Sequence, residues 1–258
     1  MLPMFKSHYS IGKSILTLDD PSESLGSSDS ILEICSENKI KDLVLVEDCP
    51  TGFFKAYKQS EKFNLNLIFG LRLKLSSFSD QENDDSIHKC ILFAKNSNGI
   101  KILNKIYSHF FCNLNGVGNY KFIKDLWKEE DLIFSVPFYD SFLYYNTFYF
   151  ANCLPDFSFC NPIFFIEDNG LPYDSFLKEE IEKYCLDNSF NFHSTKSIYY
   201  KLRSDIEAFQ TYKCICNRSF GRKKTLSNPG LEGLGSSEFC FESYLEKSKN
   251  NNEETLSL

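Results

Sequence analysis

The sequence is poor in several residue types and patterns that mark common classes of protein. Its 258 residues include four histidines, two methionines and one tryptophan. Ten cysteines are present, but none has the Cys-x-x-Cys spacing that is typical of zinc ribbons and redox motifs. We therefore exclude a zinc ribbon, including one built from Cys214, Cys216 and Cys240. We interpret the cysteines as reduced, mostly buried thiols of a reducing cytosol.

Two further absences concern membranes and nucleic acids. No apolar run is long enough to cross a bilayer, and the N-terminus lacks the pattern of a signal peptide. We expect a cytoplasmic protein with no membrane partner. Positive charge is not in excess, because 28 Lys and Arg stand against 35 Asp and Glu, which gives a formal net charge of −7. A surface that binds phosphates over its whole extent is therefore excluded, and any contact with nucleic acid is expected to be local or indirect.

Aromatic residues, by contrast, are abundant. The chain holds 26 phenylalanines and 14 tyrosines, and its hydrophobic content of 42% is ample for a globular interior. A chain of this length is expected to form one large domain around one core.

Short apolar runs alternate with amphipathic stretches over most of the chain. Apolar runs predict strands at 41–48, 64–75, 89–96, 131–136, 161–168 and 190–195. Helical periodicity predicts helices at 29–39, 52–63, 98–111, 172–188 and 203–215. Buried strands that alternate with helices favour an α/β fold, with a mostly parallel sheet or a barrel.

The composition changes near residue 217, and this change divides the chain. We expect residues 1–216 to form the α/β domain and residues 217–258 to form a C-terminal extension. The extension begins with a loop rich in Gly, Ser and basic residues, and ends in a polar tail at 247–258 that is expected to lack regular structure.

Five segments, in the same order along the chain, resemble the motifs of one known family. They read SHYSIGKS, LVLVEDCPTGFFKAYKQSEKFNLNLIFGLRL, ILFAKNSNGIKILNKIYS, FFIEDNGLPYDSFLKEEIEKY and FHSTKSIYY. The family is the PHP (polymerase and histidinol phosphatase) domain found at the N-terminus of the bacterial DNA polymerase III alpha subunit. The resemblance covers roughly residues 4–216. It implies a distorted, TIM-like β/α barrel with a metal site at the carboxyl ends of its strands.

The resemblance also implies which positions would hold the metals of an active PHP domain. Such a domain holds a cluster of divalent ions through His, Asp and Glu side chains. Its opening His-x-His falls on Met4 and Lys6, and its Asp-His pair falls on Asp48 and Cys49. Asp48 is the one plausible surviving ligand among these four, with Cys49 as a soft alternative.

The later ligand positions have changed as well. A glutamate position of the family falls on Arg72, a histidine position on Lys89, and a late Asp-x-His on Ser197 and Tyr199. Together with Lys6, the residues Arg72 and Lys89 bring positive charge to a place where divalent ions would sit. We expect these cations to pair with Asp48, Glu47 or a phosphate, and we expect no cofactor.

An alternative is a metal site rebuilt from neighbouring residues, namely His8, Asp48, His88 and His193, with zinc or manganese as the cofactor. A shift of one residue along a strand turns a side chain to the other face, which disfavours His88. A shift of two residues retains the face, so His8 stays a candidate.

Two other segments carry residues that suggest chemistry. Glu167 and Asp168 follow an apolar strand and resemble an acid/base pair, but a structural role at the strand end is favoured. Residues 134–150 include nine aromatics. Because Lys and Arg are missing from this stretch, a core edge or a protein interface is favoured over a surface that stacks single-stranded DNA.

Three functions follow from these observations. The leading hypothesis is a non-catalytic, stand-alone PHP-like protein of DNA replication, a pseudoenzyme that docks to a polymerase or another replisome protein. The second is a metal-dependent phosphoesterase or 3′–5′ exonuclease with rearranged ligands. The third is a nucleic-acid-binding module that uses basic residues as contacts for phosphate or for an acidic partner. Those residues are Lys6, Arg72, Lys89, Arg218, Arg222, Lys223 and Lys224.

Overall fold

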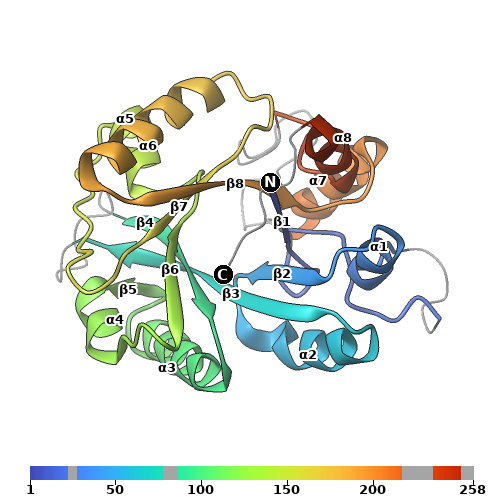
Figure 1. Ribbon diagram of the computed structural model, residues 1–258, viewed down its shortest axis with the longest axis horizontal. Helices are drawn as coiled ribbons and strands as arrows, with labels where there is room; N and C mark the ends of the chain where they lie inside the picture. Colours follow the sequence, from blue (N-terminus) through green and yellow to red (C-terminus); the bar gives the residue numbers. More distant parts are fainter. Residues whose placement is uncertain (23–27, 78–86, 217–234, 251–258) are drawn as a thin grey trace.

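A computed structural model describes residues 1–22, 28–77, 87–216 and 235–250 of the chain. Strands and helices alternate along the chain, as the sequence predicts (Figure 1). The strands are β1 (Leu2–Phe5), β2 (Asp42–Glu47), β3 (Asn66–Ser76), β4 (Ile87–Ala94), β5 (Val117–Asn119), β6 (Leu132–Val136), β7 (Ile163–Ile166) and β8 (Asn191–Ile198). The α-helices are α1 (Ile31–Glu37), α2 (Phe53–Lys62), α3 (Ser97–Asn113), α4 (Tyr120–Leu126), α5 (Phe142–Tyr149), α6 (Asp174–Asn188), α7 (Ile206–Cys216) and α8 (Phe241–Asn250).

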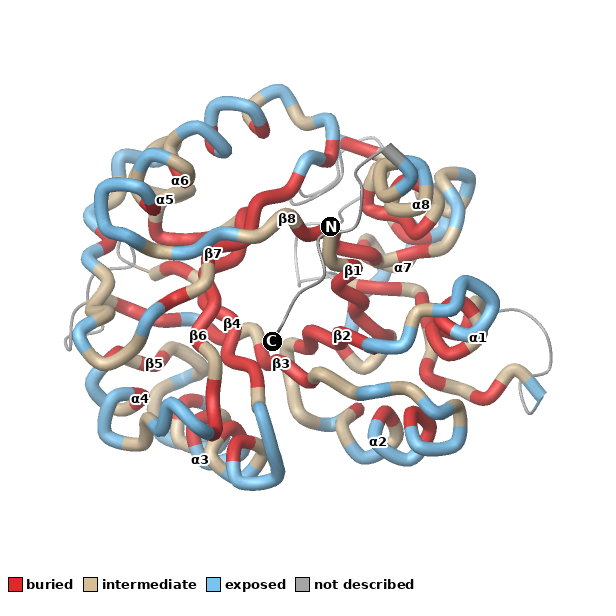
Figure 2. Tube along the Cα trace, in the orientation of Figure 1, coloured by how far each residue is buried: buried red, intermediate tan, exposed pale blue. Residues whose placement is uncertain are grey.

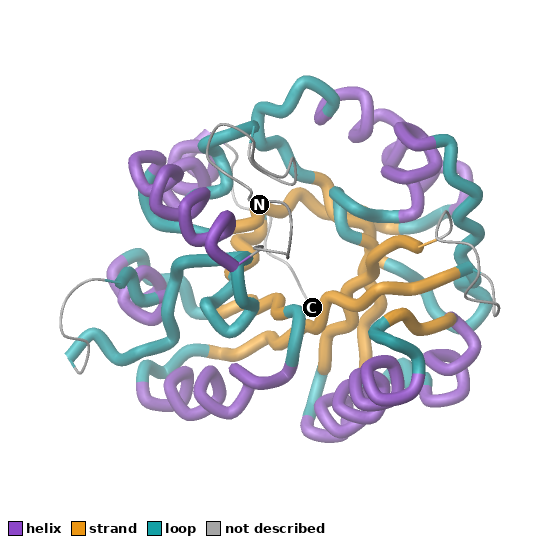
Figure 3. Tube along the Cα trace, turned by 180° about the vertical axis from the view of Figure 1, so that it is seen from behind, coloured by secondary structure: helices purple, strands orange, loops and turns teal. Residues whose placement is uncertain are grey.

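Seven strands close into a barrel. Neighbouring strands follow the order β2-β1-β8-β7-β6-β4-β3, and β3 pairs again with β2, while β5 adds to β3. Seen from behind, the strands form the central ring and the helices lie outside it (Figure 3). The predicted α/β class is confirmed in the form of a closed, mixed barrel surrounded by helices.

One strand of the barrel, β4, runs opposite to its neighbours. It is antiparallel to both β3 and β6, whereas the other strand pairs are parallel. The beginning of β4 therefore lies at the end of the barrel where the parallel strands finish. In this register Lys89 stands opposite Lys74, and Ile91 stands opposite Arg72. We call this end the barrel mouth.

Alternating side chains divide the core into two parts. The barrel interior is a compact cluster of buried side chains on four strands, namely Met4, Val44, Val46, Ile91, Phe93 and Phe165. A larger buried cluster fills the space between the strands and the helices. The helices are accordingly buried on the side that faces the sheet and exposed on the other (Figure 2). This arrangement is the one expected of an α/β barrel.

A glycine makes room for the largest ring of the interior. A Cβ atom at Gly70 would lie 2.7 Å from ring atoms of Phe93, which is closer than carbon atoms approach in folded proteins. The phenylalanine fills the space that the missing side chain leaves. The pair shows how one position on β3 is adapted to its neighbour on β4.

Several elements were not predicted from the sequence. They are β1, β5, α4, α5 and α8. Helix α5 has the sequence FLYYNTFY, whose aromatic residues have modest helix propensity. Its start is stabilised by Ser141, whose hydroxyl accepts a hydrogen bond from the amide of Tyr144 at 3.2 Å. The packing of these rings stabilises the helical conformation, and such packing cannot be predicted from a local sequence pattern.

The C-terminal extension packs on the barrel where it is described. Cys240 forms a parallel bridge with Tyr200, and the amide of Phe241 donates a hydrogen bond to the carbonyl of Tyr200 at 3.0 Å. Helix α8 continues to Asn250, so the expectation of an irregular tail was wrong for 247–250. The residues of the tail after 250, and the basic loop with Arg218, lie outside the described residues. In the part of the chain that the structure describes, no helix is both long and apolar enough to cross a membrane.

Candidate functional site

The barrel mouth gathers most of the positions at which the PHP resemblance places metal ligands. Lys6, Asp48, Arg72, Lys89 and Tyr199 line one cavity of about 420 Å³. Strand geometry explains this convergence. Lys6, Asp48 and Tyr199 directly follow β1, β2 and β8 at the mouth end of the barrel. Lys89 lies near the start of the reversed strand β4, Arg72 lies in the second half of β3, and strand alternation turns both toward the barrel interior.

Two more of these positions lie just below the cavity. Met4 and Ser197 line a second, small space of about 20 Å³, which they share with Lys6, Arg72 and Tyr199. Cys49 is the exception, because it lines neither space and its thiol donates a hydrogen bond to the carbonyl of Tyr9 at 3.4 Å.

Lys6 and Asp48 form an ion pair at the mouth. The Nζ atom of Lys6 lies 2.7 Å from the Oδ1 atom of Asp48, and the Lys6 side chain is 5% exposed. Burial by itself would raise the pKa of Asp48, but the nearby charge and hydrogen bond of Lys6 outweigh it and lower the pKa to about 2. Asp48 is therefore ionised at neutral pH, and its charge is already balanced by the protein.

Glu47, the other acid that we expected Lys6 to contact, is held differently. Its carboxylate accepts hydrogen bonds from the amide of Ser7 at 2.9 Å, from the hydroxyl of Ser7 at 2.5 Å and from the hydroxyl of Ser10. Burial raises the pKa of Glu47. These serines belong to the opening motif, so this part of the motif fixes the loop after β1 to the end of β2.

A second group of charges occupies the opposite side of the mouth. The Oδ2 atom of Asp140 lies 2.7 Å from Nζ of Lys89 and 3.4 Å from an Nη atom of Arg72. Arg72 also donates a hydrogen bond to the carbonyl of Tyr139 at 2.9 Å. Sequence reasoning did not find Asp140. The local sequence gives one indication of a site residue here, namely an acidic residue four positions after the apolar run of β6.

Arg72 lies in the field of several negatively charged groups. Burial would lower its pKa, but the carboxylates of Asp140, Asp48 and Glu167 raise the pKa above the ordinary value. Arg72 is therefore a fixed positive charge at the base of the mouth. Burial also raises the pKa of Tyr199 to about 12, so this phenol stays neutral.

The side chains at the mouth do not fit a divalent metal ion. In the described part of the chain, the carboxylates that line the cavity are those of Asp48 and Asp140, and each already lies against a lysine or arginine. A divalent ion bound between them would also meet the charges of Lys6, Arg72 and Lys89, and the resulting repulsion opposes binding. Within residues 1–22, 28–77, 87–216 and 235–250, no three His, Cys, Asp or Glu side chains are grouped as metal ligands.

The residues of the rearranged site do not come together. His8 does not line the cavity that contains Asp48, and its ring packs against Tyr9 with the centroids 4.4 Å apart. His88 points to the helix side of the sheet, where its Nε2 atom lies 2.7 Å from the hydroxyl of Tyr120. His193 precedes Ser197 by four residues of strand, which places it roughly 13 Å further from the mouth.

Comparisons with protein-family models and with curated proteins found no match to the chain.

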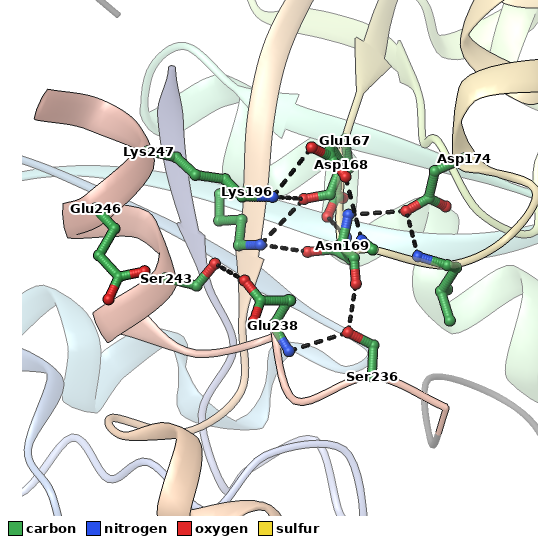
Figure 4. A network of polar contacts seen from close by, with 12 residues as sticks. Glu167, Asp168, Asn169, Asp174, Lys196, Ser236, Glu238, Ser243, Glu246 and Lys247 are labelled. Atoms are coloured by element: carbon green, nitrogen blue, oxygen red, sulfur yellow. Dashed lines mark hydrogen bonds and ion pairs between the residues drawn. The ribbon is translucent and has the colours of Figure 1, made fainter. Parts of the chain in front are cut away.

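The acids Glu167 and Asp168 take part in structural contacts (Figure 4). Glu167 accepts hydrogen bonds from the amide of Ser197 at 3.0 Å, from its hydroxyl at 2.7 Å, and from the side-chain amide of Asn169 at 2.9 Å. Asp168 pairs with Lys247 of α8 at 3.1 Å. The two carboxylates therefore serve different contacts, and neither arrangement resembles an acid/base pair.

A buried lysine joins the same network. Lys196 is fully buried, and its Nζ donates hydrogen bonds to Oδ1 of Asn169 at 2.6 Å and to the carbonyl of Asp168 at 3.2 Å. Burial lowers its pKa to about 8. The carbonyl of Asn169 also accepts a hydrogen bond from Ser236 (Figure 4). This network ties the segment before α8 to the ends of β7 and β8.

The aromatic segment 134–150 divides between core and surface. Phe142 is 3% exposed and packs in the large core, whereas Tyr149 is 63% and Phe150 is 92% exposed. Tyr144, Tyr145 and Tyr149 contribute to the wall of the mouth cavity.

Two lysines of the cavity were missed by sequence reasoning. Lys13 lies in the loop after β1 and Lys213 lies on α7, and both line the cavity. No local pattern distinguishes them from surface lysines. The predicted basic residues Arg218, Arg222, Lys223 and Lys224 lie outside the described residues.

Proposed function

We propose that the chain is a PHP-type barrel that has exchanged its metal site for ion pairs and acts as a non-catalytic binding protein of DNA replication. In this proposal its partner is a DNA polymerase or another replisome protein, and contact with nucleic acid is indirect. The observation that carries the proposal is the pairing of Lys6 with Asp48 and of Lys89 and Arg72 with Asp140.

Carboxylates that are gathered at a barrel mouth require positive charge nearby. Carboxylates that face one another repel, and an active metal site offsets this repulsion with divalent ions. In this chain Lys6, Arg72 and Lys89 pair with the two carboxylates, so the negative charge of the mouth is balanced without a metal. A barrel that is kept intact while its ligand positions carry Lys and Arg is the arrangement expected of a scaffold.

The ordered motifs support the family assignment within this proposal. Motif segments that lie far apart in the sequence contribute Lys6, Asp48, Arg72 and Ser197 to neighbouring spaces at one end of a closed barrel. The alternative of a phosphoesterase or exonuclease with rearranged ligands requires His8 and Asp48 to converge, and of these two only Asp48 lines the cavity.

A reversal experiment tests the metal part of the proposal. We expect the native protein, purified and exposed to Zn²⁺ or Mn²⁺, to retain less than one ion per chain after desalting. A variant with Lys6→His, Cys49→His, Arg72→Glu and Lys89→His restores the residue types that the resemblance implies, and it should retain metal. A matched variant with Lys6→Met, Cys49→Ser, Arg72→Met and Lys89→Met removes the same charges without adding ligands and should not.

A native protein that holds stoichiometric metal and releases nucleotides from a DNA 3′ end would overturn the proposal. Its second part is tested by co-elution of the purified chain with the replicative polymerase of its host. Absence of a complex with either the polymerase or its accessory subunits at micromolar concentration would remove the replication role.

A further inference from the structure

The charge of the mouth cavity is opposite to that of the whole chain. Among the residues that the structure describes, five cationic side chains line it, namely Lys6, Lys13, Arg72, Lys89 and Lys213, together with the two carboxylates of Asp48 and Asp140. Five cations against two carboxylates leave an excess of three positive charges, in a chain whose formal net charge is −7. A concave site with one sign of charge concentrates the field and attracts ligands of the opposite sign.

The cations approach the cavity from separate parts of the fold. Lys6, Arg72 and Lys89 belong to the barrel strands or their ends, whereas Lys13 lies in the loop after β1 and Lys213 lies on α7. Lys13 acts on both Asp48 and Asp140, since its charge helps to lower the pKa of each carboxyl group. Positive charge therefore extends from the base of the mouth to its rim, and this extent suits an anion larger than a single carboxylate.

Most of the remaining wall is aromatic. Tyr139 packs on Phe239 with ring centroids 5.8 Å apart, and Phe239 stacks on Tyr199 at 5.5 Å and an interplanar angle of 9°. Tyr173 packs on Tyr139 at 6.3 Å. At the edge of the cavity Tyr149 lines the wall while 63% of its surface stays exposed, so its ring is available to a ligand. Phenol and phenyl rings of this kind offer flat surfaces on which a planar heterocycle stacks.

We propose that the mouth cavity binds a free nucleotide carrying two or three negative charges, with its phosphates on the cationic base and its nucleobase against the tyrosine wall. A volume of about 420 Å³ is within the range of pockets that take small organic ligands. Arg72 supplies a further reason, because its buried Nε donor has no hydrogen-bond partner in the described structure and would be satisfied by a phosphate oxygen or a water. This inference does not depend on a polymerase partner.

Titration calorimetry in the presence of EDTA tests the proposal with four probes: ADP, pyrophosphate, adenosine and a ten-nucleotide oligo-dT. We expect ADP to bind with a dissociation constant of about 10–100 µM, pyrophosphate to bind at least about tenfold more weakly, and adenosine not to bind measurably. Affinity for ADP should fall as salt is raised from 50 to 300 mM, because the phosphates are held by charge.

Matched variants locate the ligand. Tyr149→Ala should weaken ADP binding about tenfold and leave pyrophosphate binding unchanged, whereas Phe150→Ala, next to it and 92% exposed outside the cavity wall, should change neither. Lys13→Gln should weaken both probes about fivefold, and Lys58→Gln, which does not line the cavity, should weaken neither. All four changes are on partly or fully exposed side chains, so the fold is expected to persist.

Three results would overturn the proposal. The first is the absence of ADP binding to the folded native protein. The second is equal affinity for pyrophosphate and ADP, since the aromatic wall would then contribute nothing. The third is binding of oligo-dT without binding of ADP, which would make the mouth a cleft for a nucleic-acid strand. If no replication partner binds the chain, all of these measurements stay unaffected. The two proposals can therefore fail separately.

Discussion

The ammonium group of Lys6 lies 2.7 Å from the carboxylate of Asp48, although 42 residues separate them in the sequence. Parallel pairing of β1 with β2 brings together the ends of the two strands, which these residues directly follow, and makes this contact. The pair stands at the centre of the positions at which the PHP resemblance places metal ligands. Its strength decides whether the mouth is stabilised by the protein's own charges.

We expect Lys6→Met to lower the free energy of unfolding by about 1–2 kcal/mol, because Asp48 then loses its charged partner. Asp48 keeps 36% of its side chain exposed, so solvent screens part of the effect. The double variant Lys6→Met with Asp48→Asn should recover part of the loss, since neither charge is then left alone. Urea unfolding of the four proteins in the cycle measures this coupling. A coupling energy of zero would show that the contact contributes nothing.

Stability should also fall in acid through the mouth carboxylates. The pKa of Asp48 is lowered to about 2 and that of Asp140 is lowered as well, so both bind protons more readily in the unfolded chain. Their stabilising contribution is complete above about pH 4 and is lost as the pH falls toward 2. Urea unfolding between pH 2 and 6 should show a shallower acid decline for Asp48→Asn than for the native protein. Parallel curves would show that the pKa of Asp48 is not lowered in the folded protein.

The lowered pKa of Lys196 gives an effect of the same sign at alkaline pH. Its pKa is lowered to about 8, so between pH 8 and about 10.5 the unfolded chain holds a proton that the folded chain has released. This group therefore adds stability as the pH rises, by at most about 1.4 kcal/mol per pH unit. Buried thiols act in the opposite direction, since burial raises the pKa of Cys35 to about 12.

The contribution of Lys196 is isolated by comparison with Lys196→Met. Cysteines and tyrosines titrate in both proteins, so their effects cancel in the difference between the two unfolding free energies. This difference, measured with a reductant at pH 7, 8, 9 and 10, should move in favour of the native protein as the pH rises. A difference that is constant with pH would show that Lys196 keeps its proton in the fold.

The barrel interior offers a test of packing. Gly70→Ala places a Cβ atom 2.7 Å from the ring of Phe93, and we expect it to lower stability by about 1–3 kcal/mol. The double variant Gly70→Ala with Phe93→Leu restores space at this contact and should be more stable than the sum of its single changes indicates. Thermal unfolding of the three variants measures this. Equal stability of Gly70→Ala and the native protein would show that the interior can rearrange.

Much of the fold follows from local patterns. The apolar runs at 41–48 and 89–96 correspond to β2 and β4, and the helical period at 98–111 corresponds to α3. These elements are encoded by residues close in sequence, so composition and spacing suffice to locate them. Helix α5 and strand β5 escape such reasoning, because their stability comes from packing partners distant in sequence.

The candidate site likewise has features that the sequence predicts and features that only the tertiary structure shows. Motif order identified Lys6, Arg72 and Lys89 as cations at ligand positions, and strand alternation put them on one face. Only the folded barrel identifies Asp140, 68 residues from Arg72, as the partner of this arginine. The same holds for Lys13 and Lys213, which line the cavity. Sequence patterns encode the period of a strand or helix and the type of charge at a position. The pairing of each carboxylate with its cation depends on strand order, on the reversed direction of β4 and on the loops at the mouth. The reason is that electrostatic interaction depends on distance in space, and distance in space cannot be read from separation along the sequence.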